Sequence, residues 1–366
     1  AKVAVEEAQA AGITVRMITG DHVVTAAAIG HELGLQGEGL SGAEFAALSD
    51  EEVDSRLDDL SVFGRVTPQD KLRLVQRLQN RGEVVAMTGD AVNDAAAIKQ
   101  AQIGVAMGSG SEVTKQAAKL VLTDDNFATL VKAVSLGRAV YQKIRNYLTF
   151  QMAQLIGLIL IFLVASIFNI NEGVALTPGM VLILNFAFAL FAVIVIIMEP
   201  PSEGVMKLPP RDPKAGIASA ASLARWLIYG VALLMAAMVP LVLGSDQLSP
   251  TDPSAPMTMA FVIVALSTLT TGLQLRRDPE SGLRAPWGKG VQLMVWPIVF
   301  LILSTQLAFL QDWVGVTSLT GWQWLACIVL TMFVMAVVEI DSALRRHHAV
   351  AARPTVEEAV APARAR

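Results

Sequence analysis

The sequence predicts two structural parts, an α/β domain with a parallel sheet and, after it, an all-α membrane domain. In the first part, short apolar runs alternate with helix-like stretches, the pattern of strands and helices along a parallel sheet. The second part contains six apolar segments, each near the roughly 20 residues that a membrane-spanning helix requires. Apolar residues make up 54% of the 366 residues and charged residues 16%, and all long apolar runs follow Tyr147.

The elements of the α/β domain follow one another in a regular order. We expect strands at Gly12–Ile18, Ser61–Val66, Glu83–Met87 and Ile103–Met107, and helices at His22–Leu33, from Pro68 and at Val92–Gln100, with a less regular acidic segment at Glu38–Leu60. Pro68 suits the first helical turn, because its missing N–H has no partner there in any helix. Asp124-Asp125-Asn126 then resembles a cap before a long helix that starts at Phe127.

The predicted spans lie at about 147–168, 179–198, 223–243, 257–275, 291–310 and 323–340, and the fourth, with its Ser and Thr, is the least apolar in pattern. Lys and Arg are absent from connections 169–178, 244–256 and 311–322. They are present in the connections that alternate with these along the chain. The positive-inside rule then places both ends of the chain in the cytoplasm. We expect domain boundaries at 1–126, 127–146 for a connecting helix, 147–343 for the membrane domain and 344–366 for a disordered tail.

Two acids follow the Val-rich run that ends at Gly89. In a parallel sheet, ligands bind outside the carboxyl ends of the strands, where the next helix begins. Asp90 and Asp94 therefore lie at a strand tip beside helix N-terminal N–H groups, which favour phosphate. Because Mg²⁺ prefers a few carboxylates together with phosphate oxygens, the pattern predicts a site for Mg²⁺ and phosphate.

Three segments in the expected order and spacing resemble motifs of P-type cation-transporting ATPases. Thr88–Asp94 (TGDAVND) resembles the hinge motif TGDGVND, Met17–His22 (MITGDH) resembles a phosphate-contacting segment, and Arg65–Lys71 (RVTPQDK) resembles the segment with the phosphate-neutralising lysine. One such motif is a weak signal, whereas three in order before six membrane segments are specific. The resemblance covers Ala1 to about His348 and implies the C-terminal half of a ten-helix cation pump with a haloacid-dehalogenase-like, Rossmann-like domain.

The resemblance implies ATP-driven cation transport through an aspartyl phosphate, with Mg²⁺ and ATP as cofactors. The family's nucleophile lies in a DKTGT motif that this sequence lacks. We therefore expect a missing N-terminal half and an inactive fragment. The implied roles are phosphate contact for Thr19, Gly20 and Asp21, phosphate neutralisation for Lys71, Mg²⁺ ligation for Asp90, support of the phosphoaspartate for Asn93 and Asp94, and nucleotide contact for Arg65.

Simpler interpretations stand beside these roles. A Thr-Gly-Asp after a strand is often only a turn and a helix cap, and for Thr19 alone that interpretation is preferable. Convergence with Asp90 and Lys71 favours the functional one. Ala91 and Ala96 stand where the family has Gly and Pro. Because Gly permits a positive φ that Ala resists, either this turn keeps φ negative or the hinge is stiffer.

In the membrane part, the resemblance implies cation-binding carboxylates and amides in the first two spans. This sequence has Gln151, Gln154 and Asn185 there, Ala189 where an acid is expected, and no Asp or Glu deep in any span. Intramembrane polar residues are costly, so these three are candidates for a transport path. Hydrogen bonding between helices is an equally good interpretation.

We expect a nucleotide, an inorganic cation and the lipid bilayer as partners, in the plasma membrane. Two alternatives remain: an atypical P-type ATPase with a non-divalent or unknown substrate, and a membrane-tethered haloacid-dehalogenase-like phosphatase. A net charge of −4 without a basic stripe predicts no nucleic-acid partner, and the single cysteine, Cys327, excludes an internal disulfide.

Overall fold

The structure is a computed structural model, and it describes the chain except residues 201–203, 213–215, 246–248, 250–251, 278–281 and 352–366. The chain forms two compact units. The α/β unit comprises Ala1–Arg138 and Glu203–Ala215, and the helical unit comprises Ala139–Ser202 and Gly216–Arg366.

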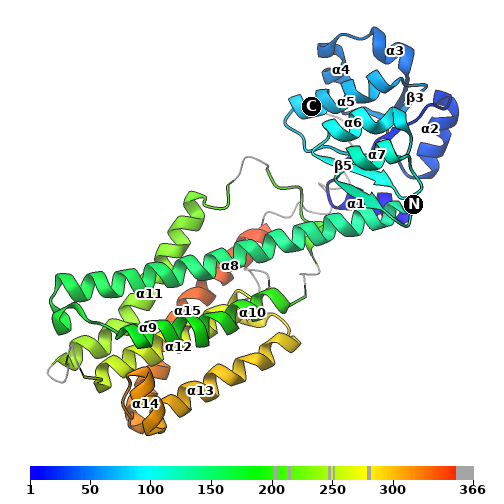
Figure 1. Cartoon of the computed structure of the whole chain (residues 1–366). Coiled ribbons are helices and arrows are strands. Elements are labelled where there is room, and N and C mark those ends of the chain that lie inside the picture. The colour runs from blue at the N-terminus through cyan, green and yellow to red at the C-terminus, as the bar shows by residue number, and fades with distance from the viewer. Residues whose placement is uncertain (201–203, 213–215, 246–248, 250–251, 278–281, 352–366) are drawn as a thin grey trace. The chain divides into compact units, whose positions relative to one another are not determined.

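In the α/β unit, helices surround short parallel strands (Figure 1). The strands are β1 (Met17–Ile18), β2 (Glu38–Ser41), β3 (Leu60–Gly64), β4 (Ala86–Gly89), β5 (Ile103–Met107) and β6 (Leu120–Leu122). The helices are α1 (Lys2–Ala10), α2 (Val23–Glu32), α3 (Gly42–Ala47), α4 (Asp50–Arg56), α5 (Pro68–Asn80), α6 (Ala95–Gln100) and α7 (Glu112–Ala117), with a 3₁₀ turn, η1 (Val92–Asp94), before α6.

The parallel pairing is confirmed, but the expected single sheet is divided into two. One sheet has the order β1-β3-β2 and the other the order β4-β5-β6. Strand β1 covers only Met17–Ile18 of the expected Gly12–Ile18, and among the described residues it pairs with β3 alone. A strand without a second neighbour gains ladder hydrogen bonds along one edge alone, which explains its short extent.

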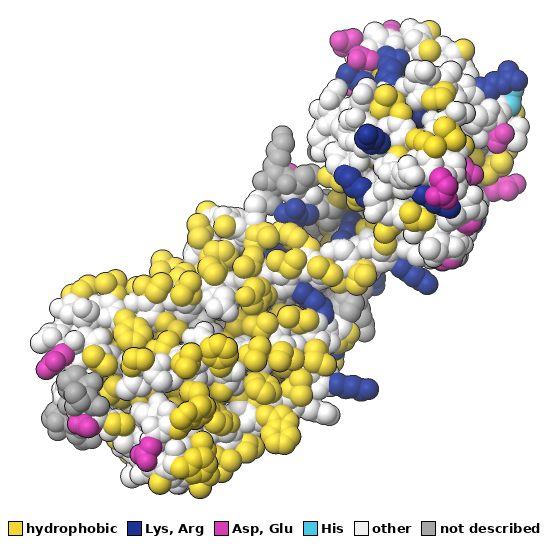
Figure 2. Space-filling view, in the orientation of Figure 1, with side chains coloured by type: hydrophobic (Ala, Val, Ile, Leu, Met, Phe, Trp, Pro, Cys, Tyr) yellow, Lys and Arg dark blue, Asp and Glu magenta, His cyan; other side chains and the backbone are white. Residues whose placement is uncertain are grey.

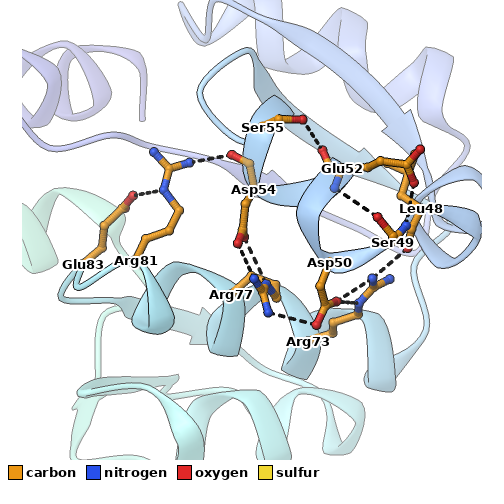
Figure 3. A network of polar contacts seen from close by, with 10 residues as sticks. All are labelled: Leu48, Ser49, Asp50, Glu52, Asp54, Ser55, Arg73, Arg77, Arg81 and Glu83. Carbon is orange, nitrogen blue, oxygen red and sulfur yellow. Dashed lines mark hydrogen bonds and ion pairs between the residues drawn. The ribbon is translucent and has the colours of Figure 1, made fainter.

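The acidic segment Glu38–Leu60 is more regular than its sequence indicates. It forms β2, α3 and α4, and both helices begin with a capping box, at Ser41 and at Ser49. Acidic residues of α4 then pair with arginines of α5, as Figure 3 shows for Asp50, Asp54 and Arg77. Helix α5 itself begins with a capping box between Thr67 and Asp70 and buries Leu74, Val75 and Leu78.

Helix α8 is continuous from Phe127 to Ile167, and its first part belongs to the α/β unit. The cap expected before it is present, because the Asn126 side chain accepts a hydrogen bond from the Ala128 N–H at 2.9 Å. The unit boundary falls at Arg138, inside the helix, whereas the sequence predicts a separate connecting helix over 127–146.

Within the described residues, six helical segments are long and apolar enough to cross a membrane, as the sequence predicts. They are Phe127–Ile167, Pro178–Met198, Ala220–Leu243, Ala255–Gln274, Lys289–Gln306 and Gly321–His347. The corresponding elements are α8; α9 (Pro178–Ile183), η3 (Leu184–Ala189) and α10 (Leu190–Met198); α11 (Ala220–Leu243); α12 (Ala255–Gln274); η7 (Lys289–Met294) and α13 (Val295–Gln306); and α15 (Gly321–Ala351). Hydrophobic side chains cover the visible side of this unit (Figure 2).

The helical unit differs in three details from six uninterrupted membrane-spanning helices. The second span contains a π-helical segment, η3. The fifth ends at Gln306, and a separate short helix, α14 (Ala308–Val314), follows. Helix α15 continues to Ala351, so residues 344–351 of the expected disordered tail are helical, and Arg345 and Arg346 pair there with Asp341 and Glu339 of the same helix. The rest of that tail lies outside the described residues.

Candidate functional site

The site begins at the carboxyl ends of β1 and β4. The chain leaves β1 through Thr19 and Gly20, and it leaves β4 through Gly89 and Asp90. The Thr19 hydroxyl lies 3.1 Å from the Asp21 carboxylate and also accepts the Asp21 N–H, so these residues form a local turn. Strand tips of parallel sheets are the usual place for ligands, and both tips carry the predicted motifs.

Lys71 reaches the β4 tip from the first turn of α5. Its Nζ lies 2.5 Å from Asp94 Oδ1, and the two side chains are only 14% and 6% exposed. Asp94 also accepts the Ala91 N–H at 3.3 Å. The buried pair therefore holds the lysine beside the loop between β4 and α6, where its remaining N–H groups can face a phosphate.

The backbone of that loop is held by residues that the motifs did not indicate. The fully buried Thr114 of α7 donates its hydroxyl hydrogen to the Ala91 carbonyl at 2.8 Å, and the Ser111 N–H donates to the Asp90 carbonyl at 2.8 Å. A Cβ on Gly89 would lie 2.5 Å from the Asp94 carboxylate, so this glycine cannot be enlarged without displacing the pair. In the sequence, the one sign of this role is that Thr114 follows three residues after Ser111, the cap of α7.

The substitution of Ala91 for the family's glycine causes no backbone strain. Ala91 has φ −91° and ψ 155°, an extended conformation open to any residue. Of the two possibilities left by the sequence, the turn here keeps φ negative. Ala96 lies on the exposed side of α6.

One cavity of about 770 Å³ gathers most of the predicted site residues. Its lining includes Thr19, Gly20, Lys71, Asp90, Asn93 and Asp94. Asp21 and Arg65 are not part of this lining. Instead, the Arg65 N–H donates to the Asp21 carbonyl at 2.8 Å, and Arg65 has φ 51°, so their backbones join the tips of β1 and β3.

The residues present suit a magnesium ion bound together with phosphate. Asp90 is exposed at the cavity, while Asp94 is engaged by Lys71. No group of three His, Cys, Asp or Glu side chains that could hold a metal occurs among the described residues. Mg²⁺ is commonly held by one or two carboxylates, with phosphate and water completing its six ligands, so a single available carboxylate fits this ion.

The three polar candidates in the helical unit line one cavity of about 550 Å³, formed by α8 and the second span. Gln154 is 6% exposed, and neither amide atom has a hydrogen-bond partner in the described structure. Asn185 lies in the π-helical segment and donates to the Val181 carbonyl at 2.9 Å. Gln151 lies beside them. An unsatisfied buried amide is rare and calls for a ligand or water, and π-helical turns frequently mark functional sites.

The acids near the span ends are paired. Glu199, directly after α10, is fully buried and accepts a hydrogen bond from Arg277 at 2.8 Å. Glu339 of α15 contacts Arg346 at 3.1 Å. Both carboxylates thus have arginine partners, and neither lines the cavity formed by Gln151, Gln154 and Asn185.

Comparisons with known proteins cover both units. A family model described as the C-terminus of cation transporting ATPases matches residues 173–344, and two models of haloacid dehalogenase-like hydrolases match residues 1–102 and 71–134. Among solved structures, the catalytic domain of the CPx-ATPase CopB-B matches 37% of this chain and 44% of that chain at 25% identity, with a TM-score of 0.29.

Curated relatives are transport ATPases. Calcium-transporting ATPase 1 of Lactococcus lactis is 35% identical over 93% of this chain and 39% of the relative. The probable cation-transporting ATPase F of Mycobacterium tuberculosis is 46% identical over 64% of this chain and 26% of the relative. A calcium-transporting ATPase of Listeria monocytogenes is 40% identical over 73% and 30%. The chain thus spans about a quarter to two fifths of the length of these relatives.

The matched models, the relatives, the parallel α/β unit and the six apolar helices agree with one another. The chain belongs to the P-type cation-transporting ATPases and corresponds to their C-terminal part.

Proposed function

We propose that this chain is part of a longer protein that couples ATP hydrolysis to cation transport through an aspartyl phosphate. This proposal rests on one observation: a single cavity is lined by Thr19, Lys71 and Asp90. In this scheme the nucleophilic aspartate comes from the part of the protein that precedes this chain, and this chain alone is inactive.

The α/β unit supplies binding and charge at the phosphate. Thr19 and Gly20 offer a hydroxyl and backbone N–H groups at the β1 tip. Lys71, oriented by Asp94, places a compact positive charge where negative charge develops during phosphoryl transfer. Asp90 would hold Mg²⁺, which when bound offsets charge on the phosphate oxygens. Asn93, in the lining of the cavity, would help to hold the phosphoaspartate, and Arg65, outside that lining, would contact the nucleotide.

The helical unit supplies part of the ion path. Gln151, Gln154 and Asn185 present neutral amides to one cavity, and the Gln154 amide is buried without a partner among the described residues. A neutral ligand set favours a monovalent cation or at most one divalent cation, because burying two charges without an anionic partner is very costly. The distribution of Lys and Arg between the connections supports a cytoplasmic position for the α/β unit.

The test is the ATPase activity of the full-length protein with Lys71→Ala or Asp90→Asn. Removing either charge should lower turnover by at least about a hundredfold, as is typical for electrostatic groups at a transition state. Lys99→Ala, on the exposed side of α6 and outside the cavity, is the matched control and should keep normal activity. Near-normal turnover in both site variants would contradict the assignment of the site.

A further inference from the structure

Three arginines meet at one end of the helical unit, each on a different span. They are Arg145 of α8, Arg225 of α11 and Arg345 of α15. The three helices pack together one to two turns deeper, where one buried apolar cluster contains a residue from each of them. Each arginine lies near the end of the apolar part of its helix, which is the depth at which phospholipid headgroups meet a membrane protein.

One carboxylate, Asp341 of α15, pairs with two of these arginines. Its Oδ2 atom lies 3.1 Å from Arg225 Nε and 2.8 Å from an Arg345 nitrogen, and it accepts the Tyr229 hydroxyl at 2.6 Å. A guanidinium has five N–H groups, and the pair with Asp341 engages Arg225 through Nε. The N–H groups on the two terminal nitrogens of Arg225 therefore remain able to bond another anion.

The third arginine, Arg145, is exposed, and its guanidinium has no hydrogen-bond or ion-pair partner in the described structure. Its own helix places it beside the other two. One turn further along α8, the Thr149 hydroxyl accepts the indole N–H of Trp226 at 3.4 Å, and Trp226 directly follows Arg225. Arg145 is also close enough to act electrostatically on Arg345. The cluster thus brings an unpaired positive charge next to a paired one.

We propose that Arg145, Arg225 and Arg345 form a patch that binds the headgroup of an anionic phospholipid from the cytoplasmic leaflet. Three arginines against the single carboxylate of Asp341 leave an excess of positive charge, which a lipid phosphate offsets. Guanidinium groups bond phosphate oxygens in pairs, and basic pockets between membrane helices bind anionic headgroups through such contacts. The distribution of Lys and Arg among the connections supports the cytoplasmic side for this end of the bundle.

The side chains next to the patch favour a lipid over a free phosphate ion. Ile228, one turn after Arg225 on the same face of α11, is 54% exposed, and Leu344, directly before Arg345, is 56% exposed. Tyr147, two residues after Arg145, is exposed as well, and tyrosine is enriched at the membrane interface. A phospholipid held by its phosphate at the patch would lay its acyl chains against these apolar surfaces, whereas a free ion would leave them uncovered.

The experiment measures lipid binding to the whole chain in a non-ionic detergent by native mass spectrometry, with phosphatidylglycerol and phosphatidylcholine as probes. The unaltered chain should bind phosphatidylglycerol at least about tenfold more tightly, because only this lipid carries a net negative charge. Arg145→Gln should weaken that binding by about fivefold, the effect of one basic charge near an anionic surface, and leave phosphatidylcholine binding unchanged. Arg145→Lys keeps the charge and should keep most of the binding, which traces the loss to charge and not to the fold.

Lys289→Gln is the matched control. It removes one positive charge from an exposed residue at the start of the fifth span, in η7, which packs against α10 and α13. Phosphatidylglycerol binding should equal that of the unaltered chain. Equal weakening by Lys289→Gln and Arg145→Gln would overturn the proposal, because the lipid would then respond to the positive surface as a whole.

Two further outcomes would contradict a lipid site. Inorganic phosphate at the concentration of the lipid should not displace phosphatidylglycerol, and displacement would assign the patch to a free anion. Equal affinity of the unaltered chain for the two lipids would show that the three arginines serve only to join α8, α11 and α15. Raising the salt concentration should weaken phosphatidylglycerol binding to the unaltered chain more than to Arg145→Gln, since exposed charges are screened by salt.

Discussion

The ion pair between Lys71 and Asp94 shows why substitutions at different site residues affect stability and activity differently. Both side chains are largely buried, so removal of one leaves the other as an unpaired buried charge, a change that typically costs about 3–5 kcal/mol. A substitution at Asp94 would therefore lower stability together with activity. Asp90 is exposed at the same tip, and its substitution tests the chemistry with less effect on the fold.

Thr114 gives a prediction about the loop that carries the site. Thr114→Val keeps the shape of the side chain but leaves the Ala91 carbonyl without its 2.8 Å hydrogen bond. The expected loss is about 1–3 kcal/mol in the free energy of local opening. It should appear as faster hydrogen exchange in β4 and η1. Thr123→Val, at an exposed position, is the control, and an equal effect there would contradict the role of Thr114.

At the scale of elements, the contact between α4 and α5 depends on charge. Arg73 and Arg77 bond Asp50 at 2.8 and 2.9 Å, and Arg77 also bonds Asp54 (Figure 3). These arginine hydrogen bonds lower the pKa of both carboxyls below their ordinary value of 3.8. The folded state therefore favours the charged forms.

This shift sets the sign of a pH dependence. A carboxyl with a lowered pKa stabilises the fold above pH 3.8, and the stabilisation is lost as the pH falls through the lowered value. Hydrogen exchange of the α4 and α5 amides, corrected for its intrinsic pH dependence, should show that the two helices open more readily below the lowered pKa of these carboxyls. Asp54→Asn should remove part of this dependence, whereas Asp59→Asn, whose exposed side chain lies outside the network, should not. Identical profiles for the two variants would contradict this account.

The π-helical segment of the second span gives a prediction about coupling. Asn185→Leu removes an amide from the cavity shared with Gln151 and Gln154. In the full-length protein it should impair cation-stimulated ATP hydrolysis and leave phosphorylation by inorganic phosphate intact, because that reaction needs only the α/β site. Phe186→Leu, exposed in the same segment, is the control. Loss of both reactions in Asn185→Leu would point to a structural role.

For the whole molecule, the proposed ion path with its neutral amides predicts a limit on the charge that is transported. Glu199 and Glu339 are held by arginines, so the described spans offer no free carboxylate to the cavity of Gln151, Gln154 and Asn185. We expect vesicles with the full-length protein to move one divalent or one monovalent cation per ATP. The measurement is the ratio of ions transported to ATP hydrolysed. A ratio of two divalent ions would contradict this account and show that these helices supply further ligands.

The hydrophobic periodicity of the sequence and the length of its apolar runs predict most of the architecture. The six spans were predictable because a bilayer demands long apolar helices, and Ile103–Met107 was predicted with the bounds of β5. The motifs located Thr19, Lys71 and Asp90, since each follows a strand or opens a helix. With the bounds expected from the sequence, the fourth span (257–275) has the weakest signal because of its Ser and Thr. In the structure, α12 is the most enclosed of the six described spans. It packs against α10, α11 and α15, and its buried Ser267 and Thr268 are thereby enclosed, with Thr268 donating to the Val264 carbonyl of its own helix at 2.7 Å.

Local periodicity and short motifs suffice to predict the order of the elements, the membrane spans and the residues at the strand tips. The folded arrangement alone reveals the division into two sheets, the pairing of Lys71 with Asp94, the support of Ala91 by Thr114 and the shared cavity of Gln151, Gln154 and Asn185. These features join residues that are distant in the chain, and their geometry depends on packing and on which hydrogen-bonding groups remain unpaired.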